Sequence, residues 1–154
     1  MTGLTLADCF SKFVETEILE DVYCARCKCL RKVEKRLSFF RIPQVLVIQL
    51  KRFSWRNDKL LEEINAPDEL KLNKYIDPQS TLSTPPLYTL SGVIKHMGGV
   101  RGGHYTASSK HADSGEWYSF NDSQVNRQPK HHCSSSDYIF FYVRKSEHLS
   151  HSKI

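Results

Sequence analysis

Two short segments joined by a compact loop, GGHYTA and WYSFND, constrain this chain most. We expect them to pair as an antiparallel hairpin, and the position of the loop then decides which residue faces His104. A four-residue loop over 111–114 places Asn121 opposite His104, whereas a five-residue loop places Asp122 there. Directly opposed residues have Cβ atoms about 4.5 to 5.5 Å apart, so either side chain would reach the imidazole.

A histidine held by such a side chain has a fixed tautomer. Its second ring nitrogen is then free to accept a proton from a nucleophile such as a cysteine thiol. A histidine on a strand is more often an ordinary surface or core residue. Gly102 and Gly103 directly before His104 favour the catalytic interpretation, because glycines let another backbone approach closely.

Composition narrows the possible functions. The 154 residues suffice for one domain, and the formal charge of +5 comes from basic residues spread along the chain. The densest basic cluster, 26–36, belongs to no nucleic-acid recognition motif, so we expect no nucleic-acid partner. Residues 1–10 lack the pattern of a signal peptide, and no apolar run is long enough to cross a bilayer. We therefore expect an intracellular protein of the cytoplasm or nucleus, with no membrane partner.

The pattern of elements predicts an α+β fold, a mostly antiparallel β sheet with a short N-terminal helix. Thr5 and Asp8 form a capping box before apolar residues at helical spacing, which predicts a helix over 5–14 with Cys9 on its buried face. The segment between 53 and 87 is rich in proline and reads as irregular. Strands are predicted over 33–41, 44–53, 88–96, 103–110, 116–121 and 138–144, the second of them central in the sheet.

The five cysteines are an odd number, and three of them lie between 24 and 29. In an intracellular chain such crowding favours metal binding or free thiols over disulfides, and we place this segment at the tip of a two-stranded ribbon. His131, His132 and Cys133 are further potential ligands within a polar loop over 126–136. They have no second ligand set, so the sequence alone predicts no metal site there.

Ordered motifs over nearly the whole chain resemble the C-terminal half of the catalytic domain of the ubiquitin-specific proteases, which are papain-like cysteine deubiquitinases. The resemblance implies that residues 1–145 are part of this catalytic domain, with a fingers remnant over about 15–45, the palm over about 45–145 and a flexible tail over 146–154. The matching motifs are LADCF (6–10), YCARC (23–27), PQVLVIQLKRF (43–53), YTL (88–90), GGHYTA (102–107), WYSFND (117–122) and YIFFY (138–142).

The resemblance also implies a site. His104 corresponds to the general base, Asn121 to the residue that orients it, and Asp122 to a second polar group. Gly103, Tyr105 and Trp117 are assigned to substrate binding, with Tyr105 as a wall of the narrow channel that accepts the Gly-Gly tail of ubiquitin. The implied reaction is cleavage of isopeptide and peptide bonds after the C-terminal glycine of ubiquitin. The implied partners are ubiquitin and ubiquitinated proteins, and catalysis needs no cofactor.

Two further implications concern cysteine. Cys24 and Cys27 correspond to one half of the family's four-cysteine zinc site, while Cys29 has the wrong spacing, so any structural zinc site here is incomplete. The family's nucleophile lies in a Gly-Asn-Thr-Cys-like segment, which this sequence does not contain. We therefore expect a partial catalytic domain that is inactive alone and exposes an apolar patch where the missing part would pack. The alternative is a non-catalytic ubiquitin-binding module.

Overall fold

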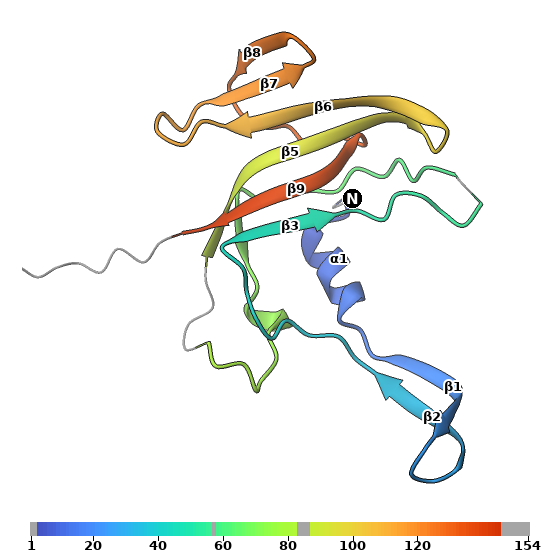
Figure 1. Ribbon diagram of the computed structural model, residues 1–154. Helices are drawn as coiled ribbons and strands as arrows, with labels where there is room; N and C mark the ends of the chain where they lie inside the picture. Colours follow the sequence, from blue (N-terminus) through green and yellow to red (C-terminus); the bar gives the residue numbers. More distant parts are fainter. Residues whose placement is uncertain (1–2, 57, 83–86, 146–154) are drawn as a thin grey trace, which may run out of the picture.

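A short helix opens the fold, as the sequence predicts. The computed structural model describes residues 3–56, 58–82 and 87–145, and α1 spans Leu6–Phe13 (Figure 1). The Thr5 hydroxyl accepts a hydrogen bond from the Asp8 backbone N–H at 3.2 Å, and the Asp8 carboxylate accepts one from the Thr5 N–H at 2.8 Å. The expected capping box is confirmed. At eight residues, α1 is too short to cross a membrane, and no other α-helix occurs in the described ranges.

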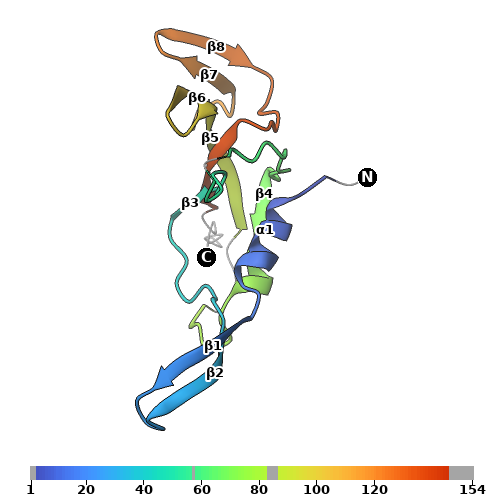
Figure 2. The same cartoon turned by 90° about the vertical axis from the view of Figure 1, so that its right-hand side faces the viewer.

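A two-stranded antiparallel ribbon follows the helix and projects away from the rest of the molecule (Figures 1 and 2). It consists of β1 (Glu17–Cys24) and β2 (Cys29–Lys35), with Cys24 opposite Cys29 beside the tip. The ribbon is confirmed, but the strand predicted over 33–41 is wrong beyond Lys35. There the chain leaves the ribbon, and Phe39 packs its ring against Phe10 of α1 and forms only a single bridge with Ile76.

A seven-stranded, wholly antiparallel sheet forms the body of the molecule, which confirms the α+β class. The strand order is β3-β9-β5-β6-β7-β8, with β4 paired beside β5, and one 3-10 turn lies at Asn73–Tyr75. The strands are β3 (Val45–Gln49), β4 (Glu69–Lys71), β5 (Leu87–Gly99), β6 (Gly102–Lys110), β7 (Trp117–Asn121), β8 (Gln124–Gln128) and β9 (Asp137–Arg144).

Two features of this sheet differ from the sequence prediction. The segment predicted as a polar loop over 126–136 begins within β8, which forms because a turn of only two residues folds the chain back along β7. Strand β3 ends at Gln49 rather than at 53, and it lies at one end of the sheet rather than in its centre. Its apolar residues on both faces had suggested a central strand, but only one face is covered.

The covered face of the sheet carries the core. Helix α1 lies on this side (Figure 2), and the segment 64–76 packs beside it. The other face is apolar and open: Val45 and Val143, which are paired across β3 and β9, are 47% and 36% exposed. Val47 on β3 is 54% exposed. A shallow hollow of about 320 Å³ crosses this face from β3 to β6. The expected apolar patch is therefore present.

Candidate functional site

The hairpin of β6 and β7 is present, but its register matches neither prediction. Lys110 pairs with Trp117, and the N–H of His111 donates to the carbonyl of Glu116 at 2.7 Å. The loop therefore has four residues, as in the first alternative, but it spans 112–115 and not 111–114. The cause is Gly115, whose φ of +70° suits a position inside the turn and not one paired in a strand.

The structure nevertheless brings His104 and Asn121 together. Nε2 of His104 lies 2.6 Å from Oδ1 of Asn121. The ladder pairs Ala107 with Phe120, which places Asn121 opposite Thr106 and leaves His104 two residues further along the same side of β6. Diagonal neighbours in a sheet are about 7 to 8 Å apart between backbones, and side chains of this length span that gap. The contact is diagonal and not directly cross-strand.

Asp122 occupies the turn after β7. Asn121 pairs with Gln124, so Asp122 and Ser123 form a two-residue turn, and Asp122 has a left-handed φ of +50°. Aspartate tolerates this conformation better than most residues. Its side chain is exposed, and no hydrogen bond within the described ranges joins it to His104. In this conformation Asn121 alone orients the imidazole.

The hydrogen bond to Asn121 sets the tautomer of His104. The amide oxygen of Asn121 only accepts, so Nε2 of His104 carries the proton and donates it. Nδ1 then bears the free lone pair, and it makes no hydrogen bond with the residues that the structure describes. Such an imidazole is a base whose accepting nitrogen is directed to an incoming proton donor.

Aromatic rings surround the start of β6. Tyr105 is 55% exposed, and its ring lies 4.6 Å from that of His96, its partner on β5. His96 is buried, so desolvation and the nearby charge of Lys59 lower the pKa of its imidazole and keep it neutral. The His96 ring also passes directly over Gly103. Tyr105 directly follows His104 on β6, so the two side chains point to opposite faces of the strand, and the exposed ring of Tyr105 packs on His96.

Trp117, assigned by resemblance to substrate binding, lies in the core. It is 6% exposed, and its ring centre is 5.9 Å from that of His131. A buried indole offers no surface to a substrate, so this placement contradicts a direct contact. Trp117 instead anchors β7 against the loop that precedes β9.

Sequence analysis missed a buried cluster around Asp137, whose side chain is fully buried. Its carboxylate accepts hydrogen bonds from the Ser134 hydroxyl at 2.9 Å and from Nε2 of His131 at 3.0 Å, and Lys95 lies 3.7 Å away. Burial alone would raise the pKa of Asp137, but these groups outweigh it and hold the pKa below its ordinary value. The hint in the sequence is a charged residue directly before an apolar strand.

Cys24 and Cys27 lie close together at the ribbon tip. The backbone N–H of Cys27 points at Sγ of Cys24 at 3.4 Å. Hydrogen bonds from Cys27, and from the Arg26 backbone, lower the pKa of the Cys24 thiol. All five cysteines are free thiols, and none forms a hydrogen bond with His104. The described residues therefore place no nucleophile against the base.

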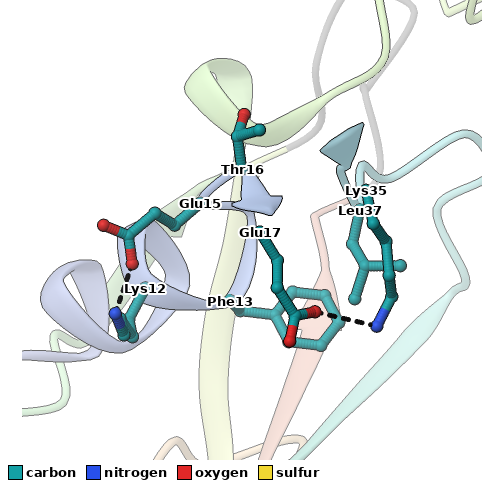
Figure 3. Close-up of a pocket in the computed structure, with 7 residues that line it drawn as sticks. All are labelled: Lys12, Phe13, Glu15, Thr16, Glu17, Lys35 and Leu37. Atoms are coloured by element: carbon teal, nitrogen blue, oxygen red, sulfur yellow. Dashed lines mark hydrogen bonds and ion pairs between the residues drawn. The ribbon is translucent and has the colours of Figure 1, made fainter. Parts of the chain in front are cut away.

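A separate hollow of about 340 Å³ lies where the ribbon joins α1 (Figure 3). Phe13 and Leu37 line it, and ion pairs of Lys12 with Glu15 and of Lys35 with Glu17 lie at its rim. Exposed ion pairs of this kind contribute little to stability, because solvent screens them. None of the predicted site residues lines this hollow.

Comparison with known proteins agrees with the geometry. Residues 10–142 match the model of a protein family described as ubiquitin carboxyl-terminal hydrolase. The chain belongs to the ubiquitin carboxyl-terminal hydrolase family. Ubiquitin carboxyl-terminal hydrolase 5 of Arabidopsis thaliana is 39% identical over 152 residues, which cover 94% of this chain and 16% of that protein. Ubiquitin carboxyl-terminal hydrolase 2 of Gallus gallus is also 39% identical, over 90% of this chain and 40% of that protein.

Solved structures show the same fold in this family. The SAGA Ubp8/Sgf11/Sus1/Sgf73 DUB module bound to ubiquitin aldehyde contains a chain that matches with a TM-score of 0.75 and 30% identity. The match covers 93% of this chain and 34% of the other. This chain thus spans less than half the length of these relatives.

Gly103→Ala should destabilise this family member. A Cβ at Gly103 would lie closer than 3.0 Å to both Nε2 of His96 and the carbonyl oxygen of Met97. The backbone oxygen cannot rotate away, so β5 and β6 must separate. We expect the free energy of unfolding in urea to fall by about 1 to 3 kcal/mol.

Gly102→Ala is the matched control, because nothing lies within 4 Å of a Cβ placed there. It should change the free energy of unfolding by no more than about 0.5 kcal/mol. Equal effects of the two substitutions would contradict the packing of His96 over Gly103.

Proposed function

We propose that this chain is the part of a cysteine-dependent deubiquitinase that supplies the general base and its orienting residue. The observation that carries this proposal is the 2.6 Å hydrogen bond between His104 and Asn121, which leaves Nδ1 of His104 as the accepting nitrogen. Family membership supports the type of bond that we propose is cleaved. The intact enzyme cleaves the isopeptide or peptide bond after the last glycine of ubiquitin.

In the proposed reaction, a cysteine thiol gives its proton to Nδ1 of His104, and the thiolate attacks the carbonyl carbon of the terminal glycine. The imidazolium returns the proton to the leaving amine as the C–N bond breaks, which leaves a thioester. His104 then takes a proton from water, and the resulting hydroxide releases ubiquitin and the thiol. Asn121 keeps the ring in the required tautomer throughout.

The nucleophile of this reaction comes from outside the chain. The five thiols of the sequence lie away from hydrogen-bonding contact with His104, and none follows a Gly-Asn-Thr segment. The open apolar face of the sheet supports this proposal, since a soluble monomer rarely leaves a large apolar face uncovered. We propose that the part carrying the cysteine packs on this face. The chain alone is then inactive.

Ubiquitin is the proposed binding partner, and ubiquitinated proteins are the proposed substrates. Tyr105 supports this because it directly follows His104 in the sequence of β6 and exposes its ring, which packs on the buried His96. Gly103 carries no side chain, which lets the His96 ring that supports Tyr105 lie close to the backbone of β6. An exposed ring held in this way suits contact with a narrow glycine tail.

We also propose that Cys24 and Cys27 are half of a structural zinc site. The N–H group of Cys27 directed at Sγ of Cys24 fits this role, because such donors stabilise a thiolate ligand. A tetrahedral zinc ion needs four ligands, so the other two would come from outside this pair. Zinc bound there would stiffen the ribbon and would take no part in the reaction.

Ubiquitin bearing a thiol-reactive electrophile at its C-terminus tests the proposal by intact mass. We expect no adduct with the chain alone. We expect a rapid adduct once the chain is fused to the preceding part of a relative's catalytic domain, and loss of that adduct in a His104→Ala fusion. An adduct of the chain alone that requires His104 would show that one of its own cysteines is the nucleophile. An unreactive fusion that folds cooperatively would contradict the proposal.

The second candidate function is a ubiquitin-binding module that does not cleave. The lack of contact between His104 and any thiol favours it. A titration of ¹⁵N-labelled, unmodified ubiquitin with the chain measures binding by NMR and distinguishes the binding module from the protease part. Binding combined with an unreactive fusion would support the module.

A further inference from the structure

His131, Cys133 and Asp137 each place one possible metal-ligand atom within 4.8 Å of the other two. The sequence shows the first two residues in a polar loop, and the fold adds the carboxylate from the start of β9. We propose that these three side chains bind a zinc ion. The site rests on the buried cluster around Asp137 and does not depend on the proposed deubiquitinase function.

The spacing of the cluster is close to that of a tetrahedral zinc site. Nε2 of His131 is 3.0 Å from Oδ2 of Asp137. Two ligands at zinc distances of about 2.0 to 2.1 Å and a tetrahedral angle are about 3.3 Å apart, so this edge already fits. A zinc-bound sulfur lies about 3.6 Å from such neighbours, and the ligand atoms here lie within 4.8 Å of one another, so Sγ of Cys133 needs to move by roughly 1.2 Å at most.

The thiol is free to make this movement. Sγ of Cys133 has only long contacts, 3.4 Å from the backbone N of Ala66, 3.8 Å from Oδ1 of Asn65 and 3.9 Å from the Ala66 carbonyl. Cys133 is partly exposed, so an ion can enter from solvent. The fourth zinc position would be left to water, as in sites with three protein ligands.

The imidazole also suits a ligand. The side chain of His131 is 2% exposed, and its Nδ1 is buried without a hydrogen-bond partner. The proposed ligand atom is Nε2, which faces Oδ2 of Asp137. When zinc binds Nε2, the ring proton moves to Nδ1, and the Cys133 thiol releases its proton to solvent.

Charge decides which ligands are essential. Lys95 lies 3.7 Å from Asp137, and Nε of Arg52 donates to the Asp137 backbone carbonyl at 2.6 Å. These two cations repel an incoming dication, and negatively charged ligands would offset that repulsion. The Asp137 carboxylate supplies one negative charge and the Cys133 thiolate another. A neutral ligand in place of the thiolate should therefore weaken binding strongly, even if it has an oxygen at the same place.

The test uses the full chain with Cys24, Cys27 and Cys29 replaced by serine, so that the ribbon thiols bind no metal. Zn²⁺ is titrated by calorimetry, and Co²⁺ by its thiolate charge-transfer absorption. We expect one equivalent of each metal to bind. Cys133→Ser should weaken binding by more than about 100-fold, the upper end of the loss caused by removing an outer-shell partner.

His132→Ala is the matched control, because this neighbouring imidazole is exposed and outside the cluster. It should change the affinity by less than about twofold. Alkylation of the unmodified chain gives a second readout: Zn²⁺ should slow the labelling of Cys133 but not that of Cys9. The proposal is overturned if the chain without the three ribbon cysteines binds no metal, or if adding Cys133→Ser to it leaves the metal affinity unchanged.

Discussion

His104→Ala is expected to lower ubiquitin cleavage by about 10⁴-fold or more in the fusion that carries the missing cysteine. The thiol then has no base, and the leaving amine has no acid, so two proton transfers are lost together. The measurement is turnover of a fluorogenic ubiquitin amide under conditions where substrate is below KM. Binding of ubiquitin should persist, because the substitution removes no large contact surface.

Comparison with nearby residues makes this result specific. Asn121→Ala should also slow cleavage, by about 10²- to 10⁴-fold, because His104 loses its only orienting hydrogen bond in the structure. Asp122→Asn should have little effect, since asparagine tolerates the left-handed turn and no bond joins Asp122 to His104. His111→Ala removes an exposed imidazole directly before the hairpin loop, and activity should stay within about twofold. A fusion that keeps a tenth of its activity without His104 would exclude this residue as the base.

Asp137→Asn is expected to lower the free energy of unfolding by about 3 to 5 kcal/mol, which is the usual cost of removing one partner from a buried charge pair. Lys95 and His131 would keep their positions but lose the charge that they face. An amide accepts hydrogen bonds at only one of its two atoms, so the donors that now face both carboxylate oxygens could not all be kept. Folded domains are stable by only about 5 to 15 kcal/mol, so the substitution should remove a large fraction of the stability of the chain.

Urea unfolding in the presence of a chelator measures this loss without any contribution from bound metal. Asp113→Asn, an exposed aspartate on the hairpin loop, is the control and should change the free energy of unfolding by less than about 0.5 kcal/mol. A loss at Asp137 below about 1 kcal/mol would mean that the cluster contributes little to folding.

Much of the fold could be predicted because its signals are local. A few consecutive residues are enough to predict the capping box of Thr5 and Asp8 and the aromatic strand β9. The position of β3 could not be predicted in this way. A strand with apolar residues on both faces has the same sequence pattern in two situations. In the first, both faces are covered within this chain, and in the second, one face is left for another part of the polypeptide to cover.

The site was predictable in its partners but not in its geometry. His104 and Asn121 were correctly paired, yet the register depended on whether Gly115 lies in a strand or in a turn, and its left-handed φ decides this only in the folded chain. The cluster of His131, Cys133 and Asp137 was missed because its carboxylate looks like an ordinary strand end. Its burial is a property of the packed loop and cannot be read from the sequence.

The position of β3 at the end of the sheet has a consequence for how such a chain survives in a cell. Its outer edge has no strand beside it in the described ranges, and its sequence, VLVIQ, has no charge and no proline. An unprotected edge of this kind is a template for pairing with any other extended chain, including a second copy. If this polypeptide is made without the part that covers it, self-association into β aggregates competes with folding from the moment it leaves the ribosome.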